Sequence, residues 1–154
     1  MNLDMRDANF QDSMDFLEWR NQDLVRKFSH NDTLITEQEH LSWFSKRLKL
    51  LPNEPFWVFE NEEGKLGLIR FDLNAPQNYF ETSILVNPSL RGHGYGRIIL
   101  NQGLWHCLET NPTVNFYAEV HQDNMISQKL FLNSGFKESS KKNKFLVFER
   151  AANS

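Results

Sequence analysis

The sequence has only one cysteine, Cys107, and no long apolar run. A single cysteine cannot form a disulfide within the chain, which favours a reducing compartment, and we expect a cytoplasmic protein. No stretch approaches the roughly 20 apolar residues that a membrane-spanning helix needs. The first residues, from Met1 to Asp7, carry charges where a secretory signal would be apolar. We therefore expect neither export nor a membrane partner.

An excess of positive charge is also missing. Lys and Arg number 17 against 20 Asp and Glu, which gives a net charge of -3, and the isoelectric point is near 5.9. General nucleic-acid binders are usually basic, so we expect no nucleic-acid partner. Low-complexity segments and internal repeats are absent, and no metal site is expected. The 154 residues predict a single domain, 1–154.

The order of predicted elements indicates an α/β fold. Thirteen Phe and four Trp supply core material. Thr36 and Glu39 form a capping-box pattern that predicts a helix ending before Pro52. The other predicted helices cover about 12–19, 24–28, 96–110 and 124–134. The predicted strands cover 2–6, 56–59, 65–72, 80–86, 114–120, 136–139 and 145–149. Antiparallel strands followed by one strand-helix-strand unit predict a mixed, mostly antiparallel central sheet flanked by helices.

The most informative segment joins a predicted strand to a predicted helix. It reads Arg91-Gly92-His93-Gly94-Tyr95-Gly96-Arg97. The glycines let backbone amides approach a ligand closely, and a helix N-terminus attracts anions, so a phosphate or pyrophosphate fits here. A tight structural turn is the alternative. The spacing is neither that of a Walker loop nor the G-x-G-x-x-G of a dinucleotide-binding fold, which would also place its glycines first in the chain.

Two motifs resemble those of the GCN5-related N-acetyltransferases (GNAT). The pattern Arg91-x-x-Gly94-x-Gly96 is similar to the acetyl-CoA signature of that family. Asn124-x-x-Ser127-x-x-Leu130-Phe131-x-x-x-Gly135-Phe136 is similar to its second signature, on a helix and the strand that follows. Both motifs stand in the family's order with the expected elements between them.

The resemblance implies an acetyl-CoA site between two splayed strands, the ones that end at Val86 and Val120. Backbone groups near Leu85 and Val86 would pair with the pantetheine arm and polarise the thioester. The amides from His93 to Arg97, including Gly94, Tyr95 and Gly96, would hold the pyrophosphate, with Arg91 and Gly92 beside them. Asn124 and Phe131 would contact the cofactor.

The resemblance also implies direct attack of a neutral amine on the thioester. Glu81, on the strand before the glycine loop, is the first candidate for the base, and a solvent-facing carboxylate is the alternative. Glu119 on the partner strand is the second candidate and His40 the third. Where the family often has a Tyr as general acid this chain has Phe131, which cannot donate a proton. Ser134 or a water is the substitute, or the thiolate leaves unassisted.

The first third of the chain is the substrate side of such folds. Its order of elements resembles the ribosomal-protein N-terminal acetyltransferases. It is more similar still to the amino-sugar N-acetyltransferases of pseudaminic acid biosynthesis, which act on a UDP-linked 4-amino sugar. That substrate needs cations and flat rings, and the predicted contacts are Arg20, Asn21, His40 and Trp43.

Three functions stay open on this basis. They are acetylation of a small amine such as a nucleotide-linked amino sugar, acetylation of a protein N-terminus, and acyl-CoA binding without catalysis. Clustered Arg20, Arg26 and Arg47 would favour the first, and an acidic groove of Asp12, Asp15, Glu18 and Asp23 the second. The sequence also leaves a homodimer open.

Overall fold

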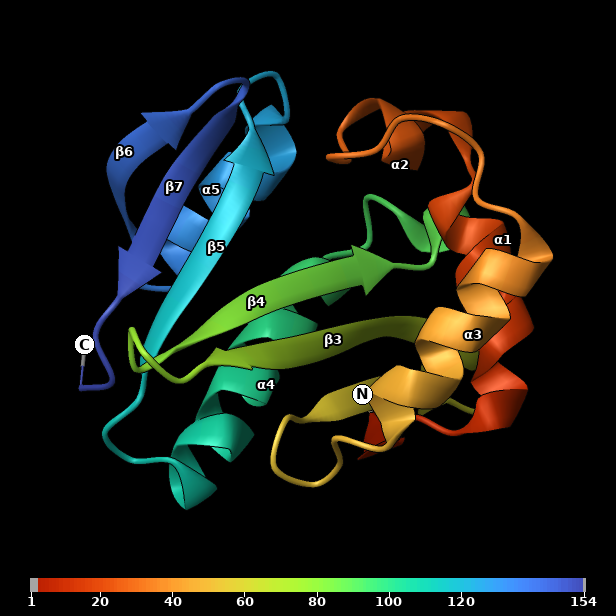
Figure 1. Cartoon of the computed structure of the whole chain (residues 1–154), viewed down its shortest axis with the longest axis horizontal. Coiled ribbons are helices and arrows are strands. Elements are labelled where there is room, and N and C mark those ends of the chain that lie inside the picture. Colours follow the sequence, from red (N-terminus) through yellow and green to blue (C-terminus); the bar gives the residue numbers. More distant parts are fainter. Residues whose placement is uncertain (1–2, 154) are drawn as a thin grey trace.

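The computed structural model describes residues 3–153 and contains one seven-stranded sheet (Figure 1). The strand order is β1-β2-β3-β4-β5-β7-β6. The strands are β1 (Asp4–Asp7), β2 (Phe56–Asn61), β3 (Gly64–Asn74), β4 (Tyr79–Val86), β5 (Asn115–His121), β6 (Lys137–Lys142) and β7 (Phe145–Arg150). Among these, β4 and β5 pair in parallel and every other pair is antiparallel. The predicted α/β fold with a mixed, mostly antiparallel sheet is confirmed. Asn2, where the first predicted strand begins, lies outside the described residues.

Within residues 3–153, five α-helices and two short 3-10 helices connect the strands. They are α1 (Ser13–Arg20), α2 (Asp23–Lys27), α3 (Glu37–Leu48), α4 (Tyr95–Thr110), α5 (Met125–Asn133), η1 (Phe10–Asp12) and η2 (Pro88–Leu90). Thr36 caps α3 by accepting a hydrogen bond from the Glu39 amide, as the capping pattern predicts. Gly135 ends α5 with φ of 93°, a left-handed conformation that favours glycine. Within residues 3–153, no helix combines the length and apolar character needed to cross a membrane.

Helices pack on both faces of the sheet and form two hydrophobic clusters. On one face, Ile69 and Phe71 of β3 belong to a cluster with Ile99 and Leu104 of α4. On the other face, Leu68 of β3 belongs to a cluster with Phe16 of α1, Phe44 of α3, and Phe56 and Val58 of β2. Successive residues of a strand point to opposite faces. Arg70 and Asp72 therefore share a face with Leu68, and their partners across the β3–β4 ladder, Ser83 and Glu81, lie on that face too.

The β4–β5 pair separates soon after it starts. It is joined at three positions, Tyr79 with Asn115, Phe80 with Phe116, and Glu81 with Tyr117. Beyond them the two strands diverge (Figure 1). The pairing of β4 with β3 continues to Val86, and the pairing of β5 with β7 continues to His121. The splayed strands expected from the sequence are thus present, and we refer to the point after Glu81 and Tyr117 as the fork.

Candidate active site

The glycine loop ends in an uncapped helix N-terminus. Gly92 and Gly94 have φ of 82° and 81°, which non-glycine residues rarely adopt. Gly94 is the N-cap of α4, so no side chain accepts from the first amides of that helix. These amides and the helix dipole can therefore serve an external anion. Arg91 and Arg97 are exposed on either side of them.

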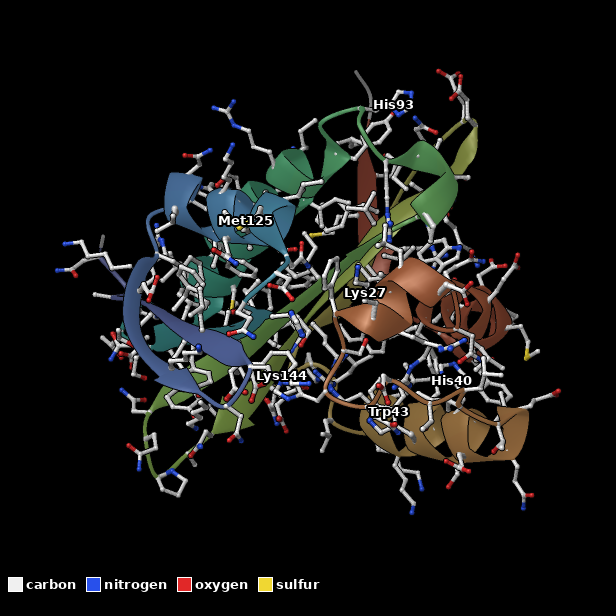
Figure 2. All side chains as sticks on the ribbon, turned by 90° about the horizontal axis from the view of Figure 1, so that it is seen from above. Lys27, His40, Trp43, His93, Met125 and Lys144 are labelled. Atoms are coloured by element: carbon white, nitrogen blue, oxygen red, sulfur yellow. The ribbon has the colours of Figure 1, made fainter. Side chains whose placement is uncertain are left out.

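Two other loop residues shape the same region. A Cβ on Gly96 would lie 3.4 Å from Val86 Cγ2 and 3.5 Å from Leu130 Cδ2, so this glycine lets α4 start close to β4 and α5. The Nδ1 atom of His93 lies 2.9 Å from the carbonyl oxygen of Leu90, which ties the ring to the loop backbone. Figure 2 shows His93 at the outer end of this loop. The loop is thus fixed by its own contacts and still presents its amides outward.

Three parts of the chain lie around the gap between the diverging strands β4 and β5. Leu85 and Val86 end β4 and lead through η2 into the glycine loop. At the tip of β5, the Asn124 amide donates to the carbonyl of His121 at 2.9 Å. The Asn124 side chain caps α5, with Oδ1 accepting from the Ser127 amide at 3.2 Å. Apart from Phe131, which lies in α5, the residues that the resemblance assigns to acetyl-CoA therefore lie at the two tips of the splayed strands and at the start of α4.

Glu81 lies at the fork, on the sheet face that α1 and α3 cover. Its carboxylate is half-buried and has no hydrogen-bond partner within residues 3–153. Burial raises the pKa of Glu81, and the nearby charges of Glu119 and Asp72 raise it further. A carboxyl group whose pKa moves upward toward neutrality is suited to accept a proton from an amine.

Glu119 occupies the same face of β5 but is already engaged. Its carboxylate accepts from the Tyr117 hydroxyl. It also lies 3.1 Å from His30 Nε2 and 3.6 Å from Lys142 Nζ. Burial and the bond to Glu119 raise the pKa of Tyr117 to about 12, so that hydroxyl keeps its proton. Of the two carboxylates, Glu81 is the one left without such partners.

The segment between α2 and α3 reaches across to the other half of the sheet. The rings of Phe28 and His121 lie 5.4 Å apart, and His30 stacks on Phe145 at 3.7 Å. Together with the contact from His30 to Glu119, these rings connect the first third of the chain to β5 and β7. Sequence reasoning missed His30, Tyr117 and Lys142. The alternation of Tyr117 and Glu119 along one strand face is a signal for the tyrosine, whereas a histidine in a loop gives none.

Two predicted substrate contacts make hydrogen bonds that hold the first helices together. His40 is fully buried, with Nε2 2.7 Å from the Ser13 carbonyl oxygen and Nδ1 3.2 Å from Arg20 Nη1. Asn21 uses both ends of its amide on the backbone of Ile35, at 3.0 Å each. His40 has no polar atom left to face a substrate, and both polar atoms of the half-buried Asn21 are already engaged. Burial also lowers the pKa of His40, which does not suit the role of third candidate base.

Ser134 lies away from the fork, and Phe131 packs in the core. Ser134 follows the last turn of α5, where its carbonyl accepts from Arg150 Nε at 3.0 Å. Arg150 pairs with Phe116, at the closed end of the β4–β5 pair, so Ser134 is not placed to protonate a thiolate in the splay. Phe131 is buried against Phe136 and belongs to the α4-side cluster. Its predicted contact with the cofactor stays a prediction.

Neither charge pattern expected to distinguish the substrates is formed. Arg47 is buried and bonded to Asp72 and to backbone carbonyls, and Arg26 pairs with Asp23 on the surface. In the expected acidic groove, Asp12 and Asp15 both pair with Lys65. Arg20 Cζ lies 5.5 Å from the ring centroid of Trp43, and both side chains are half-buried, so their predicted contact with the acceptor stays a prediction. Figure 2 shows Trp43 close to His40.

A surface hollow of about 440 Å³ lies between the first helices and the end of β4. It joins the N-terminal segment to the residues that lead into the glycine loop. The lining residues are Glu18, Trp19, Gln22, Asn87, Pro88 and Ser89.

Comparison with known proteins agrees with this geometry. An acetyltransferase named PseH from Campylobacter jejuni is 26% identical over 130 residues, which cover 84% of this chain and 80% of that protein. The structure of yncA from Salmonella typhimurium, solved with its cofactor acetyl-CoA, has a TM-score of 0.80 at 20% identity. The match covers 100% of this chain and 96% of the yncA chain. The structure of a ribosomal-protein-alanine N-acetyltransferase from Brucella melitensis has a TM-score of 0.77 at 21% identity, and the match covers 96% of this chain and 98% of that chain.

The match to a family description extends over most of the chain. Residues 2–137 match the acetyltransferase (GNAT) domain. The splayed strands and the glycine loop described above lie within this range. The chain therefore belongs to the GNAT acetyltransferase family.

Proposed function

We propose that the protein is an acetyl-CoA-dependent N-acetyltransferase that transfers the acetyl group to a primary amine by direct attack. The observation that carries this proposal is the uncapped N-terminus of α4, which follows the far end of β4, together with the half-buried carboxylate of Glu81 at the fork. An anion site and a proton acceptor at the two ends of one gap are what this reaction needs.

The residues present fit the cofactor. The amides from His93 to Arg97 would hold its pyrophosphate, with the charges of Arg91 and Arg97 beside it. The backbone of Leu85 and Val86 and the side chain of Asn124 would align the pantetheine arm. When bound, acetyl-CoA supplies the thioester that is cleaved. Because β4 and β5 do not pair beyond Glu81, the β4 edge is available to hydrogen-bond it.

Glu81 is proposed as the base, acting directly or through a water. A lysine amine costs about 4–5 kcal/mol to deprotonate at pH 7, and an α-amine under about 2 kcal/mol. The raised pKa of Glu81 makes it a stronger proton acceptor for either amine. Since Phe131 has no hydroxyl and Ser134 lies at the closed end, we propose that the thiolate leaves without a side-chain acid.

For the acceptor we propose a nucleotide-linked 4-amino sugar. The proposal rests on the resemblance of the first third of the chain and on the identity with PseH. A protein N-terminus is the second candidate, favoured by the order of elements shared with the ribosomal-protein enzymes. Acyl-CoA binding without turnover is the third.

An amine screen with acetyl-CoA tests the proposal. The panel contains a UDP-linked 4-amino sugar, peptides with free N-termini and polyamines, and thiol release is followed. We expect turnover with at least one amine and its loss in Glu81→Gln. Tight acetyl-CoA binding without turnover of any amine would refute catalysis and favour the third candidate.

A further inference from the structure

Two guanidinium groups from different elements flank one indole ring on the acceptor side of the sheet. Arg70 Cζ, from β3, lies 5.0 Å from the ring centroid of Trp43. Arg20 Cζ, from the end of α1, lies 5.5 Å from the same centroid. Burial lowers the pKa of Arg20, and the charge of Arg70 lowers it further. Two guanidinium groups thus share one indole ring, and an anion that binds both would offset the repulsion between them.

Arg20 has no carboxylate partner within residues 3–153. Its hydrogen bond goes to Nδ1 of His40. Since Nε2 of His40 lies 2.7 Å from the Ser13 carbonyl oxygen, Nε2 carries the proton and Nδ1 accepts from Arg20. The buried histidine thus holds the guanidinium in place without neutralising it. Most of the five N–H donors of this half-buried Arg20 stay available for a ligand.

Arg70 is also incompletely neutralised. Its Nε lies 3.2 Å from Asp72 Oδ2, while the other oxygen of that carboxylate accepts from Arg47 Nε at 2.8 Å. One negative charge therefore serves two arginines. Arg70 keeps the two terminal nitrogens of its guanidinium for an external group.

The arginine pair lies close to the proposed base. Arg70 faces Ser83 across the β3–β4 ladder, and Ser83 is two residues from Glu81 on the same strand. Residues two apart on one strand face are separated by roughly 7 Å. A small molecule can therefore reach from the arginines to Glu81.

We propose, resting on the proposed function, that Arg20, Arg70 and Trp43 form an anion subsite of the acceptor pocket. It binds a phosphate or carboxylate of the acceptor and places the amine of the same molecule at Glu81. Acceptors that carry an anionic group roughly 7 Å from the amine are preferred over neutral ones. Polyamines are disfavoured, because a second ammonium would meet two guanidinium groups.

Matched acceptors test this preference. The pairs are glucosamine 6-phosphate with glucosamine, and glycylglycine with glycylglycinamide, each assayed for kcat/KM with acetyl-CoA. We expect the anionic member of at least one pair to react roughly 10- to 100-fold better, as for loss of a charged hydrogen bond. A preference for the phosphate pair alone identifies phosphate, and one for the dipeptide pair alone identifies a carboxylate. Equal rates within both pairs would overturn the proposal.

Substitutions then locate the subsite. Arg70→Gln and Arg20→Gln should each remove most of the preference, whereas the control Arg26→Gln, on the surface of α2, should keep it. A preference that survives both substitutions would overturn the assignment. Should Arg20→Gln fail to fold, Arg70→Gln decides, since Arg70 packs on the surface of the ring and is 23% exposed.

A binding measurement separates this inference from the proposed function. Glucosamine 6-phosphate is titrated calorimetrically with CoA at saturation, so that the glycine loop is occupied. Binding that Arg70→Gln weakens and Arg26→Gln does not would support the subsite even if no amine is acetylated. Absence of binding to the wild-type protein, with acetyl-CoA binding intact, would overturn the subsite and leave the proposed cofactor site standing.

Discussion

Gly94→Asp is the sharpest test of the cofactor site. The Cβ of residue 94 would meet no atom within 4 Å, so the new side chain has room and the fold should survive. The carboxylate would lie at the N-terminus of α4, where the pyrophosphate is expected. Two unit charges about 4 Å apart interact by about 4 kcal/mol at an effective dielectric constant of 20. With about 1.4 kcal/mol per tenfold change, acetyl-CoA affinity should fall roughly 1000-fold.

Gly94→Asn is the matched control. Asn has nearly the size of Asp, tolerates the φ of 81° similarly and carries no charge. Isothermal titration with acetyl-CoA should therefore give a much smaller loss for Asn than for Asp, and raising the salt concentration should narrow the gap. If both variants bind as the wild type does, the pyrophosphate does not lie at this loop. If both lose affinity equally, backbone strain and not charge is responsible.

Three further substitutions concern polar groups at and near the fork. Glu81→Gln should lower kcat roughly 100- to 10,000-fold with acetyl-CoA affinity retained; wild-type kcat would refute the base assignment. The same variant should have a higher melting temperature than the wild type at neutral pH. Because the pKa of Glu81 is raised in the folded state, the ionised carboxylate destabilises the fold above that pKa. The difference in melting temperature should vanish at a pH below the ordinary pKa of a glutamate. Glu119→Gln removes a charge that raises the pKa of Glu81, so the acidic limb of the plot of kcat/KM against pH should move to lower pH. An acidic limb at the same pH as in the wild type would show that the charge of Glu119 does not act on Glu81. Arg47→Ala should cost about 3–5 kcal/mol in urea unfolding, because Asp72 and three backbone carbonyls each lose a hydrogen bond to the buried guanidinium, and a loss under about 1 kcal/mol would contradict this.

Local signals in the sequence predicted the elements well. The cap at Thr36 and the glycine stop at Gly135 depend on residues within one or two helical turns, and both are present. Only the first half of the capping box is found, since the Glu39 side chain makes no return bond to Thr36 among the described residues. The positive φ of Gly92 and Gly94 likewise follows from the glycine pattern itself.

Partners of polar side chains were harder to predict, because they come from distant segments. His40 is predicted as a substrate contact and third candidate base, but its two nitrogens meet Ser13 and Arg20 of α1. Arg47 looks like a solvated cation near a helix end, but it satisfies carbonyls of the following loop and β3. Arg70 carried no motif at all. Its place beside Trp43 depends on how α3 packs on the sheet.

The sheet also constrains the order of chemical steps. The glycine loop leads into α4, on one face, whereas Glu81, Ser83 and Arg70 lie on the face that α1 and α3 cover. Two substrates that enter from opposite faces can meet at the fork, where no strand pairing separates them. The single cysteine cannot carry the acetyl group between them: Cys107 is fully buried in α4, and burial raises the pKa of its thiol to about 12. Direct transfer, as proposed, requires both substrates to be bound together, and initial rates measured against both concentrations should give intersecting lines. Parallel lines would require a covalent carrier elsewhere and would contradict direct transfer.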